Sequence, residues 1–257
     1  MEASIVSLAR YPVKGLSGEP LHEASLTPGE GFVGDRILAF ARHGTPFDED
    51  APTPLQKRAF HMLARDAALA TLATRYDPAT DTLTLSGATE TTARLATADG
   101  IAAAENAIAA HLGHSADAAP RLVRGKGRHR FTDVSVVSDE FMQAVSIVNL
   151  ATIADFAART GHTITPERFR ANIVVDGWPA WSELQLEGAT INAGTARLRG
   201  LLRTERCAAT TVNPLTAARD VPIPRLLTET VGHADLGLYV SVEGGGVLRP
   251  GDTLTVV

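Results

Sequence analysis

The division of this 257-residue chain into short strand-like segments, separated by turn residues, constrains its fold more than any other feature. The predicted strands are residues 4–11, 37–41, 82–86, 172–175, 195–202, 236–242 and 253–257. Only two longer segments, 99–112 and 149–160, repeat apolar residues at helical spacing. Many short strands with few helices, and no visible alternation of βαβ units, predict a β-rich α+β fold of the barrel kind.

The length of the chain and one weakly apolar stretch predict two closely packed halves. A chain of 257 residues is long enough for one large domain or two small ones. Residues 113–130 have the weakest apolar pattern and are rich in Ala, Gly and Arg. We therefore place the domain boundary in this stretch and predict domains of residues 1–118 and 119–257.

Charge and cysteine content exclude several classes of protein. The net charge of −5 gives no general attraction to nucleic acid or to anionic lipid, so neither partner is expected. The first residues lack a secretory pattern, and no apolar run is long enough to span a bilayer. A single cysteine rules out an internal disulfide, a four-cysteine zinc site and a four-thiolate iron–sulfur cluster. We expect a protein of the reducing cytoplasm.

Three local patterns each have a simple structural interpretation. Residues 29–34 match G-x-G-x-x-G, but no strand–helix context surrounds them, so a glycine-rich turn is predicted. His111 and His114 lie at the end of a predicted helix, where histidine favours the helix dipole, and nearby residues do not complete a metal site. The basic run at 121–130 is interpreted as either a solvated loop or a site for a phosphate-bearing ligand. No G-x-S-x-G elbow occurs, which argues against a hydrolase.

Cys207, the only cysteine, has two interpretations from local chemistry alone. A lone cysteine is commonly a small buried apolar residue. Arg203 and Arg206 flank it, however, and positive charge favours the thiolate, which attacks, carries sulfur or binds a soft metal. Glu205 opposes this effect. The local sequence leaves the choice between packing and chemistry open.

Five ordered segments, the fourth of which contains Cys207, resemble a known family. The segments are Tyr11–Leu16, Gly34–Arg36, Arg168–Val175, Arg206–Pro214 and Gly232–Tyr239 with Val247–Asp252. Their order and spacing resemble those of MOSC proteins, named after the C-terminal domain of molybdenum cofactor sulfurases. The chain is also similar to the amidoxime-reducing component of mitochondria and its bacterial relatives. This resemblance covers nearly the whole chain and implies a MOSC β-barrel fold with an N-terminal β-barrel-like half.

The resemblance assigns expected roles to numbered residues. It implies that Cys207 is catalytic and either ligates the molybdenum of a molybdopterin cofactor or carries sulfur. The implied cofactor-binding residues are Lys14, Gly15, Arg36, Arg170, Asn172 and Glu205. Lys14 and Arg36 fall in segments that reach the cofactor phosphate, and Arg170 and Asn172 match an Arg-x-Asn pair that hydrogen-bonds the cofactor. Guanidinium forks and an ammonium suit a phosphate ligand.

Two departures from the family pattern bear on the cofactor and substrate. Glu205 stands where the reductases have a serine, and its carboxylate either hydrogen-bonds the pterin or substrate or repels an anionic dithiolene. Ala171 replaces the proline common in the Arg-Pro-Asn motif, which loosens the backbone between Arg170 and Asn172.

The resemblance implies an oxidoreductase that reduces N-hydroxylated or N-oxide substrates with a molybdenum cofactor. Because the chain has no iron–sulfur module, electrons are expected from a separate ferredoxin- or cytochrome-type partner. A persulfide-carrying sulfur-transfer protein and a non-catalytic cofactor-binding module remain the alternatives. Pyridoxal phosphate binding is a further property associated with the family.

Overall fold

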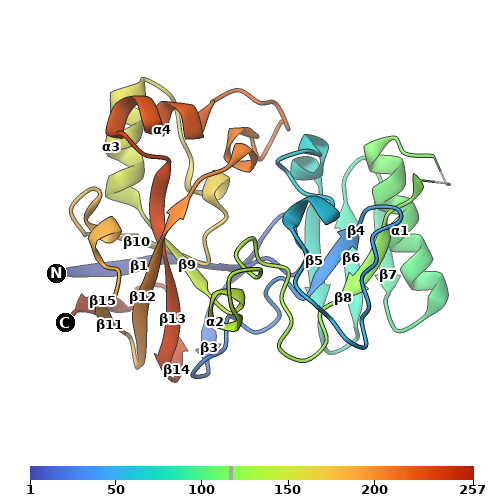
Figure 1. The fold of residues 1–257 in the computed structure, drawn as a ribbon, viewed down its shortest axis with the longest axis horizontal. Coiled ribbons are helices and arrows are strands. Elements are labelled where there is room, and N and C mark those ends of the chain that lie inside the picture. The colour runs from blue at the N-terminus through green and yellow to red at the C-terminus, as the bar shows by residue number, and fades with distance from the viewer. Residues whose placement is uncertain (116–117) are drawn as a thin grey trace.

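The structure is a computed structural model that describes residues 1–115 and 118–257. Its largest sheet closes into a barrel because β1 pairs with strands at both ends of the strand order (Figure 1). In order around the barrel the strands are β1 (Glu2–Arg10), β10 (Ile173–Asp176), β9 (Val145–Asn149), β13 (Asp235–Gly244), β12 (Ala196–Glu205), β11 (Thr190–Ala193) and β15 (Thr253–Val256). The predicted β-rich α+β class is confirmed.

One part of the barrel differs from the sequence prediction. β9 and β10 are parallel and are connected through helix α3 (Leu150–Thr160), which makes a βαβ unit. We predicted no such unit, and this was wrong. All five residues of β9 are buried, so the strand shows no alternation of polar and apolar residues. The predicted helix of residues 149–160 supplies the crossover.

Apolar side chains fill the barrel interior. Ile5 and Leu8 of β1 point inward at no more than 2% exposure, on either side of a bulge in the strand. They pack against apolar side chains from each of the six remaining barrel strands. The bulge adds one residue between Ile5 and Leu8, so both side chains face the barrel interior although they lie three residues apart. Outside the barrel, α3 and α4 (Ile223–Val231) pack on each other through a separate cluster around Phe156 and Leu227.

The smaller half contains its own core and its own sheets. Its elements are β4 (Leu38–Ala41), β5 (Ala73–Asp77), β6 (Thr82–Ser86), β7 (Glu90–Arg94), α1 (Ala98–Leu112) and β8 (Arg121–Arg124). β4 pairs with β8, while β5, β6 and β7 form a meander. α1 begins at a Thr97 N-cap and ends at Gly113 in the left-handed conformation, and it buries Ala104 and Ile108 against the meander.

Short elements complete the chain. They are β2 (Glu19–Leu21), β3 (Ala24–Leu26), η1 (Lys57–Ala59), η2 (Ala67–Thr71), α2 (Asp139–Met142), η4 (Pro166–Phe169), η5 (Ser182–Gln185), η6 (Ala208–Thr211) and β14 (Gly246–Leu248). The domain boundary at residue 118 stays a prediction, although hydrogen-bonded strands cross it: β1 and β2 belong to the barrel, and β3 pairs with β14. In the described part of the chain, no helix is both long and apolar enough to cross a bilayer.

Candidate functional site

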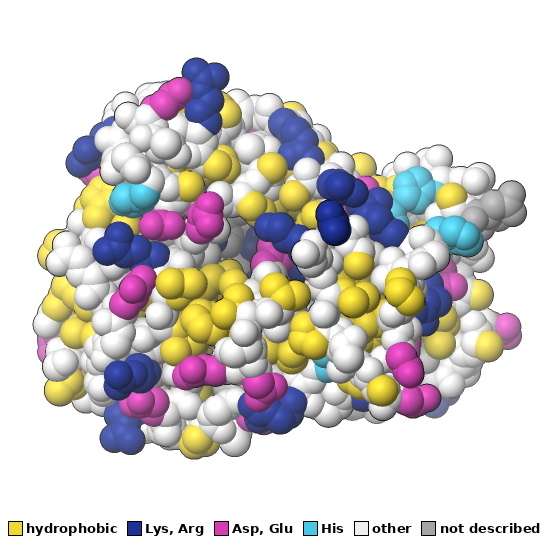
Figure 2. Space-filling view, viewed as in Figure 1, with side chains coloured by type: hydrophobic (Ala, Val, Ile, Leu, Met, Phe, Trp, Pro, Cys, Tyr) yellow, Lys and Arg dark blue, Asp and Glu magenta, His cyan; other side chains and the backbone are white. Residues whose placement is uncertain are grey.

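A cavity of about 110 Å³ opens between the barrel and the smaller half. All seven residues implied by the resemblance line it: Lys14, Gly15, Arg36, Arg170, Asn172, Glu205 and Cys207. They come from the turn after β1, the turn before β4, the start of β10 and the end of β12. The face shown in Figure 2 is hollowed near the seam, with basic and acidic side chains around the hollow. The fold therefore brings the motif residues together, while their roles stay predictions.

The backbone of the cavity wall adopts left-handed conformations at three motif residues. Gly15 has φ +81°, and a Cβ atom there would lie 2.9 Å from the His61 carbonyl oxygen and from Met62 Cα. Only glycine fits this close approach. Arg36 and Arg170 also have positive φ, +51° and +52°. Strained backbone of this kind is held by surrounding structure and is common at functional sites.

Asn172 connects three other segments of the chain through side-chain hydrogen bonds. It is 1% exposed, and its Oδ1 accepts hydrogen bonds from the backbone N and the Oγ of Ser146. Its Nδ2 donates to the Ala9 carbonyl and to Asp35 Oδ1, both at 3.1 Å. Asp35 also accepts from Tyr11 N at 2.6 Å. The amide of Asn172 is thus fully engaged by the protein, which suits a positioning role rather than a direct contact with a ligand.

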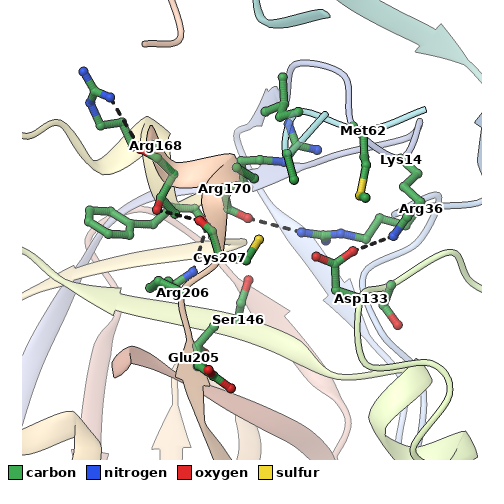
Figure 3. Close-up of a pocket in the computed structure, with 18 of the residues that line it drawn as sticks. Lys14, Arg36, Met62, Asp133, Ser146, Arg168, Arg170, Glu205, Arg206 and Cys207 are labelled. Atoms are coloured by element: carbon green, nitrogen blue, oxygen red, sulfur yellow. Dashed lines mark hydrogen bonds and ion pairs between the residues drawn. The ribbon is translucent and has the colours of Figure 1, made fainter. Parts of the chain in front are cut away.

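Two cations of the cavity have carboxylate partners. Lys14 Nζ, on a residue 5% exposed, donates to Asp133 Oδ1 at 2.5 Å and to the Phe131 carbonyl at 2.9 Å. Arg36 forms an ion pair with Asp35 and donates to the Arg170 carbonyl at 3.2 Å (Figure 3). Burial opposes the ionised form of Asp133, but Lys14 outweighs it and holds the pKa of that carboxyl far below its usual range.

Arg170 differs from these two cations. Its Nη1 donates to the Leu16 carbonyl, and its Cζ lies 4.4 Å from the centre of the Tyr11 ring. No carboxylate forms an ion pair with it among residues 1–115 and 118–257. Burial lowers the pKa of its guanidinium to about 10, which leaves it charged at neutral pH. This buried cation is available to an anionic ligand.

Arg206 holds the segment that carries Cys207. Its Nε donates to the Leu236 carbonyl at 2.6 Å and its Nη1 to the Phe169 carbonyl at 3.1 Å. Its Nη2 is buried without a hydrogen-bond partner, and burial lowers the pKa of the guanidinium to about 10. Cys207 follows at the start of η6, is half-buried, and lines the cavity between the two halves (Figure 3).

Glu205 and Ala171, the two departures from the family pattern, have different surroundings. Glu205 is exposed at the end of β12, and in Figure 3 it lies at the edge of the drawn group, away from Cys207. Ala171 is 4% exposed, and its carbonyl accepts a 3.4 Å hydrogen bond from the Tyr11 hydroxyl. A hydrogen bond from the neighbouring loop therefore restrains the backbone at the position where relatives have a proline.

The other sequence patterns lie outside the cavity. Three cations of the basic run form ion pairs: Arg124 with Asp81, Lys126 with Asp50, and Arg128 with two carboxylates. Arg121 and Arg130 donate to backbone carbonyls, and no cation of the run lines the Cys207 cavity. The ring of His111 contacts the Ala68 carbonyl at 2.8 Å, and residues 29–34 form turns.

Sequence reasoning missed three groups that line or border the cavity. Asp133 has no motif around it, and its partner Lys14 is 119 residues away. Met62 projects from the smaller half toward Arg36 and Asp133 (Figure 3). Lys57 is not part of the lining, but its Nζ lies 3.7 Å from Asp133 Oδ2; burial opposes its charge, while Asp133 and Cys207 raise its pKa. Of these three residues, only Lys57 could have been noticed in the sequence, by its charge. The contacts that bring Asp133 and Met62 to the cavity are long-range and leave no local pattern in the sequence.

The cavity contains one thiol and several cations, and this combination limits the chemistry that the cavity can support. Among the residues described, no three His, Cys, Asp or Glu side chains come together as ligands of a metal ion. A metal held by Cys207 therefore needs its remaining ligands from a cofactor or solvent. The fold and site define a β-barrel protein with a cationic cavity beside a single thiol.

Comparison with known proteins gives this class a family. The model of the MOSC domain matches residues 114–255, more than half of the chain. The chain belongs to the MOSC domain family, which confirms the resemblance seen in the sequence.

Individual relatives are more distant. Mitochondrial amidoxime reducing component 2 of Rattus norvegicus is 30% identical over 120 residues, which cover 42% of this chain and 35% of that protein. The match thus spans about a third of the relative. Among solved structures, the YuaD protein from Bacillus subtilis has a TM-score of 0.46 at 17% identity and covers 99% of this chain and 94% of its own. YiiM from Geobacillus stearothermophilus has a TM-score of 0.36 at 22% identity and covers 44% and 53%.

Proposed function

We propose that this protein is a molybdenum-cofactor-dependent oxidoreductase that removes oxygen from N-hydroxylated or N-oxide substrates. One observation carries the proposal: the thiol of Cys207 shares a cavity with Arg170 and Arg206, two guanidinium groups that lack carboxylate partners among the residues described. Family membership and the distant amidoxime-reducing relative support the same chemistry.

The donor set fits molybdopterin. The cofactor is an anion with a phosphate, and the Arg206 Nη2 and Arg168 Nε groups are buried donors without partners. An anion nearby offsets the cost of burying these charges. The cavity volume of about 110 Å³ is below the ~300–1,000 Å³ of ordinary ligand pockets. A pterin-sized ligand therefore has to move side chains of the lining, among which Met62 is the most adaptable.

Each of these residues would have its own role in the proposed reduction. Cys207 would hold the metal, Arg170 would bind the phosphate, and Lys14 and Arg36 would fix the loops around it. The bound cofactor would supply two-electron exchange with the substrate. The net reaction takes a hydroxylamine, two electrons and two protons to an amine and water. Lys57, which pairs with Asp133 and interacts with Cys207, would hold a proton for the departing oxygen.

In this proposal the electrons would come from a separate redox protein of the ferredoxin or cytochrome class, because the single cysteine of this sequence cannot ligate an iron–sulfur cluster. A reducing compartment such as the cytoplasm would keep Cys207 as a thiol. No feature of the cavity favours pyridoxal phosphate over another phosphate-bearing ligand.

Sulfur transfer is the second candidate, favoured by the exposed face of Cys207 and by Lys57 beside it. A Cys207 persulfide, loaded by a persulfide-bearing donor protein, would pass its outer sulfur to an acceptor thiolate and leave as thiolate.

Production in a host that supplies molybdopterin distinguishes the candidates. We expect molybdenum and pterin near one per chain and reduction of an aryl amidoxime by reduced methyl viologen. A 32-dalton adduct on Cys207 without metal would favour sulfur transfer, and bound cofactor without reduction would indicate a binding module.

A further inference from the structure

Arg219 is an exposed residue that bridges the two halves of the molecule outside the cavity of the candidate site. On the barrel side, its Nη1 donates to the Ala208 carbonyl at 3.1 Å and to Thr211 Oγ1 at 2.9 Å. On the smaller half, its Nη2 donates to the Leu63 and Ala64 carbonyls at 3.0 and 2.9 Å. Each Nη group carries two hydrogens, so all four are used to join one segment to the other.

The two segments that Arg219 joins line the Cys207 cavity from its two sides. Residues 62–64 line it from the smaller half, and Cys207 and two residues of η6 line it from the barrel side. Among the residues described, the Nη2 contacts of Arg219 are the only hydrogen bonds between residues 62–64 and residues 206–220. The separation of these two walls therefore depends directly on one guanidinium.

The link made by Arg219 can open while the rest of its segment stays in place. Residues 212–220 extend from the barrel side toward the smaller half (Figure 1). Val212, 3% exposed, packs into the core of the smaller half, and Asp220 accepts two hydrogen bonds from the buried Arg168. Within the described chain, no carboxylate pairs with Arg219, and water can replace the partners of an exposed donor.

We propose that Arg219 is a positioning residue that holds the two walls at their closed separation, and that its release admits the cofactor. The closed cavity holds about 110 Å³, against ~300–1,000 Å³ for ordinary ligand pockets, so the walls must separate around a pterin-sized ligand. The identity of that ligand rests on the proposed function. The closed separation itself depends only on contacts within the chain.

The test is the rate at which two uncharged maleimides label Cys207, the only cysteine, in the full-length cofactor-free protein. N-Methylmaleimide is small, and N-(1-pyrenyl)maleimide carries the same reactive group on a large body. We expect Arg219→Gln to raise the pyrenyl rate about tenfold, or ~1.4 kcal/mol, and the methyl rate less than about twofold. A tenfold change is in the range that one or two neutral hydrogen bonds contribute net.

Two further variants separate the hydrogen bonds of Arg219 from its charge. Arg219→Lys keeps the charge, but an ammonium has three donors on one atom and cannot reach four oxygens on two segments. Its pyrenyl rate should therefore rise as in Arg219→Gln. Arg225→Gln is the matched control, because Arg225 is exposed on α4 and pairs with Glu229 away from the cavity. The control should keep the ratio of rates of the parent protein.

Each outcome of the labelling decides the proposal. An unchanged ratio of the two rates overturns it, provided that circular dichroism and melting temperature show folded Arg219→Gln protein. An equal rise of both rates also overturns it, since that would show a more reactive thiol rather than a wider opening. So does a parent-like ratio in Arg219→Lys, which alone decides the question if Arg219→Gln does not fold.

Cofactor exchange gives a second measurement, in protein produced in a host that supplies molybdopterin. Arg219→Gln should lose its cofactor to an excess of cofactor-free parent protein about tenfold faster than the parent does. Equal rates of loss would overturn the role of Arg219 in admitting the cofactor. Absence of molybdenum from parent and variants alike would contradict the proposed function, whereas the maleimide rates would still decide whether Arg219 closes the cavity.

Discussion

The two sides of the Cys207 cavity carry similar numbers of cations but differ in how those cations are neutralised. On the barrel side, Arg170 and Arg206 have no carboxylate partners among the described residues. On the other side, the turns hold Lys14 and Arg36 in ion pairs with carboxylates. A count of basic residues would treat the sides alike. The contacts show that the attraction for an anion is concentrated on the barrel side, while the turn side is organised by its own charges.

Among the charged residues of the cavity, the largest effect is expected for Arg170→Gln. Removing the unneutralised guanidinium should lower cofactor occupancy about 10- to 100-fold, since a hydrogen bond to a charged group is worth about 1.5–3 kcal/mol. Lys14→Gln should lower it less, because Asp133 already neutralises that ammonium. Molybdenum per chain after dialysis measures both, with exposed Arg159→Gln as control. Equal losses in the Arg170 and Lys14 variants would show that the two sides do not differ.

Asp133→Asn should make the two sides more alike. The change frees Lys14 and Lys57 from their shared carboxylate, so the affinity for a phosphate-bearing cofactor should rise about tenfold, or ~1.4 kcal/mol. The measurement is the concentration of free molybdopterin that half-loads the apo-protein. A fall in loading would show that Lys14 needs its ion pair in order to position the turn.

The pH dependence of stability gives a second test of the Asp133→Asn variant. The pKa of Asp133 is lowered in the folded protein, so its ion pair stabilises the fold above the unfolded pKa of about 4. This stability is lost as the pH falls toward the folded pKa. Urea unfolding from pH 7 to pH 2.5 should therefore show a smaller acid-dependent fall in the free energy of unfolding for Asp133→Asn than for the parent protein. Parallel curves would contradict the ion pair.

The smallest effect is expected for Glu205→Ser. Glu205 is exposed, so water and salt screen its repulsion of an anionic cofactor. Loading should rise only a few-fold at low salt and match the parent at about 0.5 M salt. A rise as large as that of Asp133→Asn would mean that the Glu205 carboxylate turns into the cavity when cofactor is bound.

Sequence patterns predicted the fold where the signal is local. The turn at residues 76–81 and the alternation of Leu83 and Leu85 correspond to the β5–β6 hairpin, and Gly113 and Gly161 end the two predicted helices. β9 was missed because a strand buried on both faces has no period.

The candidate site also divides into residues that the sequence predicted and contacts that it did not. Ordered motifs located Cys207 and the residues around it. The charge balance depends on pairs such as Lys14 with Asp133 that only the folded chain brings together.

The metal content of Cys207→Ser shows whether Cys207 ligates molybdenum. Cys207 is half-buried at the start of η6, so serine should leave the fold and melting temperature unchanged. Parent and variant are produced together in a host that supplies molybdopterin. If Cys207 ligates the metal, the variant loses its molybdenum or retains metal that has lost one sulfur ligand by X-ray absorption. Full occupancy with an unchanged sulfur count would contradict it.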